Sequence, residues 1–325
     1  MAEKQKRKIR MSYLGGFLLA IFFFCLVGCS KEVMYKPVFE GVRDIYIVRG
    51  NTADYEGDVQ AFDADGEEIT GDIQIDASQV VLDECGEYTL IYRIEDDEGN
   101  RAEAGCKVYV VEGEAAVPII LKEQESAFLR ISHENGGEII KGSGFIVEIT
   151  EEAVYAMTNA HVVGEQEEVE LYFYEGSNAR GRVLARKEEP DMAVVRVEAE
   201  SLAPKLLERI RAVELEIGYW DNLDPQALPA AGYRCMNTDG SLWIEEVGRL
   251  LEKQKTTWIS QYPLVQYTME NKNGASGSAV IDESGRLIAM ALGVSEEENT
   301  RAFWGIGLPD LLVFYEEATG RRPGY

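Results

Sequence analysis

Apolar and polar residues alternate along two stretches of this chain, and both patterns predict β-strands. Between residues 37 and 112, short apolar runs are separated by turns rich in Asp, Gly and Asn. Within this stretch Tyr88, Leu90, Tyr92 and Ile94 alternate with mostly polar residues, as in a strand with one buried face. Because no helical period appears here, we expect residues 37–112 to form a small β-sandwich.

Strand-like patterning returns on a larger scale after a short segment, residues 113–122, which contains Pro118 and predicts a linker. The number of strands in residues 123–325 fits two six-stranded barrels, and helices are expected at 202–213 and 309–319. The predicted fold class is therefore all-β, a sandwich followed by a double barrel with a C-terminal helix. The strands predicted for the second region include 128–132, 144–149, 154–158, 169–173, 182–185, 193–197, 258–260, 264–268, 279–282, 287–292 and 303–306.

The N-terminal residues 1–28 have the pattern of an export signal. A basic segment precedes an apolar run that is shorter than the roughly 20 residues a spanning helix needs. The run ends in Leu-Val-Gly-Cys, which resembles a bacterial lipobox and implies lipid attachment at Cys29. The alternative is an uncleaved membrane anchor. Both interpretations place the rest of the chain outside the cytoplasm and tethered to a membrane, with residues 29–36 as a tether.

Composition narrows the functional classes. The formal net charge is −26, and such an acidic surface repels nucleic acid, so we expect no nucleic-acid partner. The acidic turns of the first stretch predict no calcium site of the EF-hand type, because Ala61 stands where the first acidic ligand would be. We expect no metal.

Three cysteines lie beyond the export signal. Cys85 and Cys106 are the only pair within one predicted domain, so an exported protein could join them. A turn centred near Glu98 would instead set Cys85 opposite a residue near position 111, which disfavours the disulfide and leaves the question open. Cys235 is expected to be a free, buried thiol.

Three residues occur in the order and setting of a catalytic triad. His161 follows Thr-Asn-Ala, Asp191 follows Pro190, and Ser276 lies in Gly-Ala-Ser-Gly. A serine hydroxyl needs a base within hydrogen-bond reach, which His161 would supply while Asp191 orients the imidazole. Gly274 would let the chain turn so that the N–H groups of Gly274 and Ser276 form an oxyanion hole. His133, the other histidine, has no motif around it and is expected to be exposed or packed.

Two family resemblances extend this interpretation. Residues 37–112 resemble the bacterial immunoglobulin-like modules of surface proteins, through Ala-Phe-Asp-Ala-Asp-Gly at 61–66, Gly-Glu-Tyr-Thr-Leu-Ile-Tyr at 86–92 and Asp-Glu-Gly-Asn-Arg-Ala at 97–102. Residues 125–315 resemble the HtrA/Deg-type branch of the trypsin-like peptidases. The matching segments are 142–147, 158–163, 191–195, 274–277 and 305–309.

The second resemblance implies a chymotrypsin-like double β-barrel with endopeptidase activity, catalysis by His161, Asp191 and Ser276, and no cofactor. The sequence departs from the family pattern after the nucleophile, where Ser278 and Ala279 stand. Ala275 cannot pair with a newly formed N-terminus, so activation by such cleavage is not expected. The chain ends soon after the family segment, so we expect the PDZ domain usual in HtrA proteins to be missing.

The sequence gives a less direct indication of substrate preference than of the catalytic residues. The base of the S1 pocket in trypsin-like folds lies about six residues before the nucleophile, which is Glu270 here; a buried carboxylate there would favour Lys or Arg at P1. The alternative is a solvent-facing glutamate, since HtrA-type enzymes generally prefer small aliphatic residues. The leading hypothesis is a membrane-anchored extracytoplasmic serine endopeptidase acting on proteins or peptides. The alternatives are a catalytically silent binding lipoprotein and an adhesin; the sequence leaves the oligomeric state open.

Overall fold

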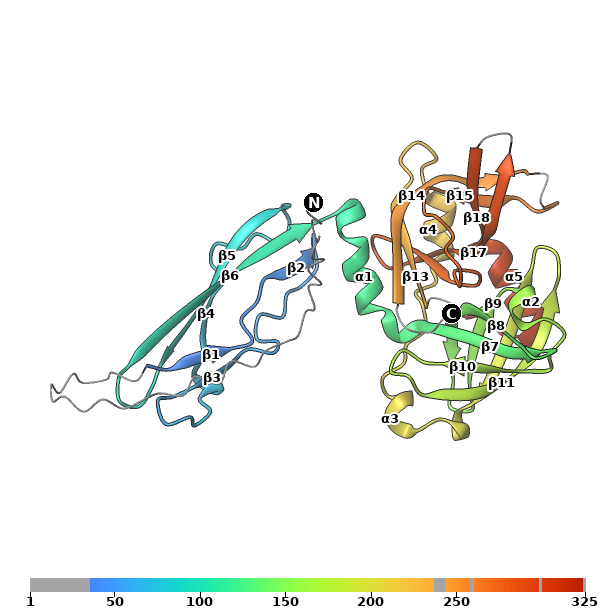
Figure 1. Cartoon of the computed structure of the whole chain (residues 1–325). Coiled ribbons are helices and arrows are strands. Elements are labelled where there is room, and N and C mark those ends of the chain that lie inside the picture. The colour runs from blue at the N-terminus through green and yellow to red at the C-terminus, as the bar shows by residue number, and fades with distance from the viewer. Residues whose placement is uncertain (1–35, 237–242, 258–259, 298–299, 324–325) are drawn as a thin grey trace, which may run out of the picture.

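The computed structural model describes residues 36–236, 243–257, 260–297 and 300–323, and shows two β-rich domains joined by a short helix (Figure 1). The predicted export signal and Cys29 lie outside the described residues. In the described ranges, no helix combines the length and the apolar character that crossing a membrane requires.

The N-terminal domain consists of a four-stranded sheet and a two-stranded sheet that enclose one small core. Alternate residues of the long hairpin face this core, so that Leu90, Tyr92 and Val108 are almost fully buried, as the alternating pattern predicted. The larger sheet has the order β2 (Ile45–Val48), β6 (Arg101–Val111), β5 (Gly86–Glu95), β4 (Gln74–Asp76), and the smaller one pairs β1 (Val38–Glu40) with β3 (Gln60–Phe62). A single 3-10 turn, η1 (Thr70–Asp72), precedes β4.

The register of the β5–β6 hairpin shows whether Cys85 and Cys106 can form a disulfide. Gly86 pairs with Val110 and Leu90 with Cys106, which sets Cys85 level with residue 111, as the turn position predicted. Cys85, Cys106 and Cys235 are all free, and Cys235 is buried, which confirms the expectation for that thiol. Burial raises the pKa of Cys235 to about 12, so this thiol stays protonated and unreactive near neutral pH.

The segment expected to be a linker folds into η2 (Gly113–Ala115) and the helix α1 (Val117–Glu123), followed by η3 (Glu125–Ala127). Pro118 stands in the first turn, where its missing N–H costs nothing. Val117 and Leu121 are fully buried in the core of the second barrel. A Cβ on Gly232 would lie 2.5 Å from Val117 Cγ1, so only glycine lets the helix approach this closely. Helix α1 therefore packs as part of the second barrel.

Two closed six-stranded barrels follow, which confirms the predicted all-β class and double barrel (Figure 1). The first has the order β10-β11-β12-β9-β8-β7 and the second β13-β14-β15-β18-β17-β16. The strands of the first are β7 (Phe128–Asn135), β8 (Glu138–Ile149), β9 (Ala153–Thr158), β10 (Glu168–Tyr172), β11 (Asn178–Lys187) and β12 (Met192–Glu198). Those of the second are β13 (Ala230–Met236), β14 (Trp243–Lys255), β15 (Leu264–Tyr267), β16 (Ala279–Asp282), β17 (Leu287–Glu297) and β18 (Thr300–Gly307).

The helix predicted at 202–213 is wrong. The region instead holds only the single turn α3 (Pro204–Leu207), and the 3-10 turn η4 (Ala199–Ser201) precedes it. Leu206 and Ile210 do pack on the first barrel, but Val213 donates its N–H to the Ile146 carbonyl of β8, at 2.9 Å. This backbone bond to a strand replaces the bond that would have continued the helix. Another short helix, α4 (Ile217–Asn222), follows.

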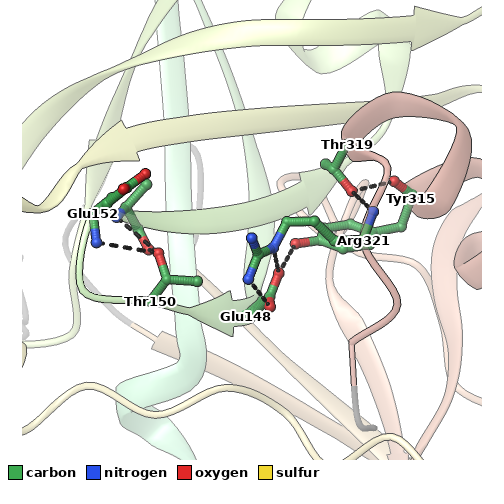
Figure 2. Close-up of polar contacts among 7 residues, drawn as sticks. Glu148, Thr150, Glu152, Tyr315, Thr319 and Arg321 are labelled. Atoms are coloured by element: carbon green, nitrogen blue, oxygen red, sulfur yellow. Dashed lines mark hydrogen bonds and ion pairs between the residues drawn. The ribbon is translucent and has the colours of Figure 1, made fainter.

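The C-terminal helix α5 (Leu308–Thr319) confirms the prediction for 309–319 and ties the end of the chain to the first barrel. Figure 2 shows Tyr315 and Arg321 meeting on Glu148 of β8. The Tyr315 hydroxyl donates to Glu148 Oε2 at 2.6 Å, and Arg321 donates to both carboxylate oxygens at 2.7 Å. The hydrogen bonds from Arg321 lower the pKa of Glu148, so the carboxylate is ionised in the folded protein.

Candidate active site

His161 lies on the one-turn helix α2 (Ala160–Val163), directly after β9. Its Nδ1 is 2.6 Å from Asp191 Oδ2, and its backbone N–H donates to Asp191 Oδ1 at 2.9 Å. Both carboxylate oxygens therefore hold the same residue, which fixes the ring orientation and leaves Nε2 as the ring nitrogen available to a substrate or nucleophile. The His161 side chain is 52% exposed, and that of Asp191 only 18%.

Pairing of β9 with β12 brings these two residues together. Thr158 at the end of β9 is opposite Ala193 at the start of β12, so α2 and Asp191 leave the same end of the barrel. Asp191 has a φ of 79°, which costs energy for a residue with a side chain. The Asn159 side chain donates to the Asp191 carbonyl at 3.0 Å and holds the backbone in this conformation.

Ser276 lies in the turn between β15 and β16 of the second barrel. Gly274 and Gly277 have φ of 96° and 85°, values that glycine adopts without strain. Inside the turn, Ala275 N–H donates to the Lys272 carbonyl and Ser278 N–H to the Ala275 carbonyl, both at 2.9 Å. In the part of the chain that the structure describes, the N–H groups of Gly274 and Ser276 donate no hydrogen bond.

The Ser276 turn is hydrogen-bonded to strand β8 of the first barrel. Ser143 of β8 donates its N–H to the Ser276 carbonyl at 2.8 Å and its Oγ to the Gly274 carbonyl at 2.7 Å. A Cβ on Gly142 would lie 2.5 Å from Val162 Cγ2 of α2 and 3.2 Å from the Ser276 carbonyl oxygen. Ser276 is thus brought beside the helix of His161. Among the described residues, no hydrogen bond joins Ser276 to His161.

Three residues hold this arrangement in a way that the sequence did not predict: Ser143, Thr158 and Asn159. Each is at most 1% exposed although its side chain is polar. Thr158 Oγ1 donates to the Ser143 carbonyl at 2.6 Å. The signal available in the sequence was a set of small polar residues at the ends of apolar strands, beside His161 and inside Gly-Ser-Gly. His133, in contrast, is simply packed on β7.

Glu270, the expected base of the S1 pocket, already has a cationic neighbour. Lys272 Nζ donates to Glu270 Oε2 and is 3.4 Å from Glu246 Oε1. The Tyr233 hydroxyl donates to the Glu270 carbonyl and accepts from Lys272 N–H at 3.1 Å. A basic P1 side chain would compete with Lys272, so the S1 role of Glu270 stays a prediction. Among the described residues, no group of His, Cys, Asp and Glu has the geometry to hold a metal ion.

Comparison with known families agrees with the fold. Residues 142–290 match the family model described as the trypsin-like peptidase domain. Residues 38–110 match the model described as the bacterial surface protein, Ig-like domain. The chain therefore contains a trypsin-like peptidase domain, preceded by an Ig-like domain of the bacterial surface type, and both resemblances seen in the sequence are confirmed.

Among individual proteins, the chain is similar to serine proteases described as HtrA-like. Two of them, from Staphylococcus aureus strains bovine RF122 / ET3-1 and USA300, are each 25% identical over 164 residues, which cover 46% of this chain. The match covers only 19% of each relative's length. A solved structure of a variant of the HtrA-type protease AlgW with tripeptide superposes with a TM-score of 0.50 at 17% identity, covering 62% of this chain and 64% of that chain. The similarity to these relatives supports the serine protease class, and the likeness to the solved structure supports the fold.

Proposed function

We propose that this protein is an extracytoplasmic serine endopeptidase in which His161, Asp191 and Ser276 form the catalytic triad. The observation that carries the proposal is the two-point bond between His161 and Asp191 on a trypsin-like fold. The Ser276 turn is hydrogen-bonded to Ser143 of β8, next to Gly142, which lies beside the helix of His161. Binding alone gives no physical reason for one carboxylate to pair with both the ring and the backbone N–H of an exposed histidine.

The proposed reaction has two stages. Ser276 Oγ attacks the carbonyl carbon of the scissile bond while His161 Nε2 takes the hydroxyl proton. The tetrahedral intermediate collapses as His161 returns that proton to the departing amine, which leaves an acyl-enzyme on Ser276. A water molecule, deprotonated by His161, then attacks the ester carbon. The bond from that carbon to Ser276 Oγ breaks, the acyl group leaves as a carboxylic acid, and His161 returns the proton to Ser276 Oγ. Asp191 keeps the imidazole in the required tautomer throughout and stabilises its charged form.

The oxyanion hole of the proposal is made by the N–H groups of Gly274 and Ser276. Both are without another acceptor among the described residues, so both are available to the negative oxygen that forms during attack. Donors of this kind contribute about 2.7–4 kcal/mol each to transition-state stabilisation. Glycine at position 274 matters because a φ of 96° directs its N–H in a way that other residues rarely allow.

The extracytoplasmic location rests on two supports. The N-terminal sequence ends in a lipobox-like Leu-Val-Gly-Cys, and the first domain matches a family described for bacterial surface proteins. We propose that lipid attached to Cys29 anchors the chain to the membrane.

The alternative function is a protease-like surface lipoprotein that only binds, favoured by the missing bond between Ser276 and His161.

Labelling with a fluorophosphonate tests the proposal, because this reagent reacts with a serine only when base and oxyanion hole are formed. The full-length chain in detergent is compared with Ser276→Ala and with Ser201→Ala, a serine on η4 that takes no part in the site. We expect labelling of the wild type and Ser201→Ala, and none of Ser276→Ala. A folded wild type that is not labelled would favour the binding protein.

A further inference from the structure

Ser143 is a buried polar residue whose hydrogen-bonding groups are all used around the nucleophile. It lies in β8 of the first barrel with 1% of its surface exposed. Its N–H donates to the Ser276 carbonyl at 2.8 Å, its Oγ to the Gly274 carbonyl at 2.7 Å, and its own carbonyl accepts from Thr158 Oγ1 at 2.6 Å. Two of these three bonds cross from the first barrel to the second.

Hydrogen bonds hold the three successive peptide groups from Gly274 to Gly277. In the first, Ser143 Oγ holds the Gly274 carbonyl and the Lys272 carbonyl accepts from Ala275 N–H. In the last, Ser143 N–H holds the Ser276 carbonyl, and Gly277 N–H donates to the Ala291 carbonyl at 3.0 Å.

The middle peptide differs from its two neighbours. Its carbonyl, that of Ala275, accepts from Ser278 N–H, while its N–H, that of Ser276, is left without an acceptor. This N–H is one of the two donors of the proposed oxyanion hole. The surrounding bonds therefore orient a group that makes no bond of its own, which is the arrangement that preorganised catalysis requires.

The turn needs this support because glycine gives it conformational freedom. Gly274 and Gly277 lack a Cβ that would restrict rotation, so neither residue fixes the peptide planes beside it. The Ser143 backbone bond to Ser276 is supplied by any residue at position 143. The bond to the Gly274 carbonyl depends on the hydroxyl alone, and it holds the carbonyl side of the residue that provides the other oxyanion donor.

We infer that Ser143 is a positioning residue: its hydroxyl fixes the Gly274 carbonyl and thereby sets the oxyanion hole of the second barrel from the first. This inference rests on the proposed peptidase function. The Thr158 hydroxyl donates to the Ser143 carbonyl. Glycine at position 277 leaves space for this hydrogen bond, because a Cβ there would lie 2.2 Å from the Ser143 carbonyl oxygen. The two barrels are thus coupled at the point where charge develops during catalysis.

Ser143→Ala tests the inference, since it removes the hydroxyl and keeps the backbone bond. Hydrolysis of fluorescently labelled casein and inactivation by a fluorophosphonate are measured on the full-length chain in detergent. We expect kcat to fall about 10- to 100-fold with KM changed by less than about threefold, because a displaced donor affects the transition state more than substrate binding. The limiting rate of inactivation should fall by a similar factor at an unchanged affinity for the reagent.

Ser201→Ala is the matched control, because it removes a serine hydroxyl that also donates to a carbonyl, that of Glu198 at 2.7 Å, away from the site. Its kcat should equal the wild-type value. If Ser143→Ala does not fold, Ser143→Cys keeps the volume with a weaker donor and should give an intermediate rate. An unchanged kcat in the folded variant overturns the inference, as does a fall in activity that only follows a fall in folded protein. A wild type that is not labelled overturns the proposed function instead.

Discussion

The two barrels hold their parts of the candidate site in different ways. In the first barrel, polar side chains make the holding bonds: the Asp191 carboxylate pairs with the ring and the backbone N–H of His161, and the Asn159 amide donates to the Asp191 carbonyl. In the second barrel, hydrogen bonds from Ser143 hold the backbone carbonyls of the Ser276 turn. The shape of this turn depends on the positive φ of Gly274 and Gly277. The proposed acid–base half thus depends on hydrogen bonds made by side chains, and the proposed nucleophile half depends on backbone geometry.

Because of this difference, the two halves of the candidate site should be sensitive to different kinds of amino-acid substitution. A substitution that preserves shape but alters hydrogen-bonding character should damage the first half most. A substitution that adds a single Cβ should damage the second half most, because the space beside Gly277 is already occupied by backbone of the first barrel. The hydrogen bonds that tie Tyr315 of α5 and Arg321 to Glu148 of the first barrel form a third category, which affects stability and not chemistry.

The largest effect is expected from Asp191→Asn, which alters the first half without changing its shape. The asparagine oxygen can still accept from His161 N–H, but its amide would donate to Nδ1 and leave the proton on Nε2, so the imidazole could no longer act as a base. We expect kcat to fall about 10⁴-fold with the fold retained. The kcat of casein hydrolysis is measured for both proteins, with circular dichroism as the folding control. A fall in kcat of less than tenfold would contradict the triad assignment.

Gly277→Ala is expected to break the second half. Its Cβ would lie 2.2 Å from the Ser143 carbonyl oxygen and 2.5 Å from Thr158 Oγ1, at a φ of 85°. Steric overlap and backbone strain together should lower the free energy of unfolding by about 2–5 kcal/mol and abolish fluorophosphonate labelling. Denaturant unfolding measures the first quantity.

Gly176→Ala separates strain from overlap, because Gly176 has a φ of 90° and nothing within 4 Å of the added Cβ. This control should cost only the strain, about 1–2 kcal/mol, and leave labelling intact. Equal losses in the two variants would show that close packing between the barrels adds nothing at Gly277.

The smallest effect is expected from Glu148→Gln, which weakens the tie between α5 and the first barrel. Arg321 lowers the pKa of Glu148, so the ionised carboxylate stabilises the fold fully above its ordinary pKa, and this contribution is lost as pH falls through the lowered value. We expect a loss of about 1–3 kcal/mol at pH 7 and a flatter decline of stability in acid than in the wild type. Urea unfolding between pH 3 and pH 7 measures both.

Glu316→Gln is the control on the same helix, since Glu316 pairs with Arg322 at 2.8 Å on the surface, where such pairs contribute little. Neither variant should change casein hydrolysis at neutral pH. A steeper acid decline in Glu148→Gln than in the wild type would contradict the role given to this carboxylate.

Sequence patterning predicted most strands but failed where exposure was high or residues were small. β13 begins Ala-Ala-Gly and has little β-propensity, and β14 carries charged residues over much of its length because it is half-exposed. Both strands exist because closing the second barrel pairs them with neighbours. The strand predicted at 258–260 falls partly outside the described residues, and residue 260 is not in a strand. The three proposed triad residues were visible in the sequence, whereas their support was not.

What the sequence by itself determined was local: alternation set the strands, turn position set the β5–β6 register, and Gly307, Pro309 and Gly320 bounded α5. Tertiary structure alone decided that α1 packs in the second barrel, and that Ser143 reaches Gly274 across 131 positions of the chain. The physical reason is the sequence separation over which each kind of interaction acts. Backbone propensity and turn chemistry act over a few residues, whereas the partner of a buried hydroxyl depends on how two closed barrels meet.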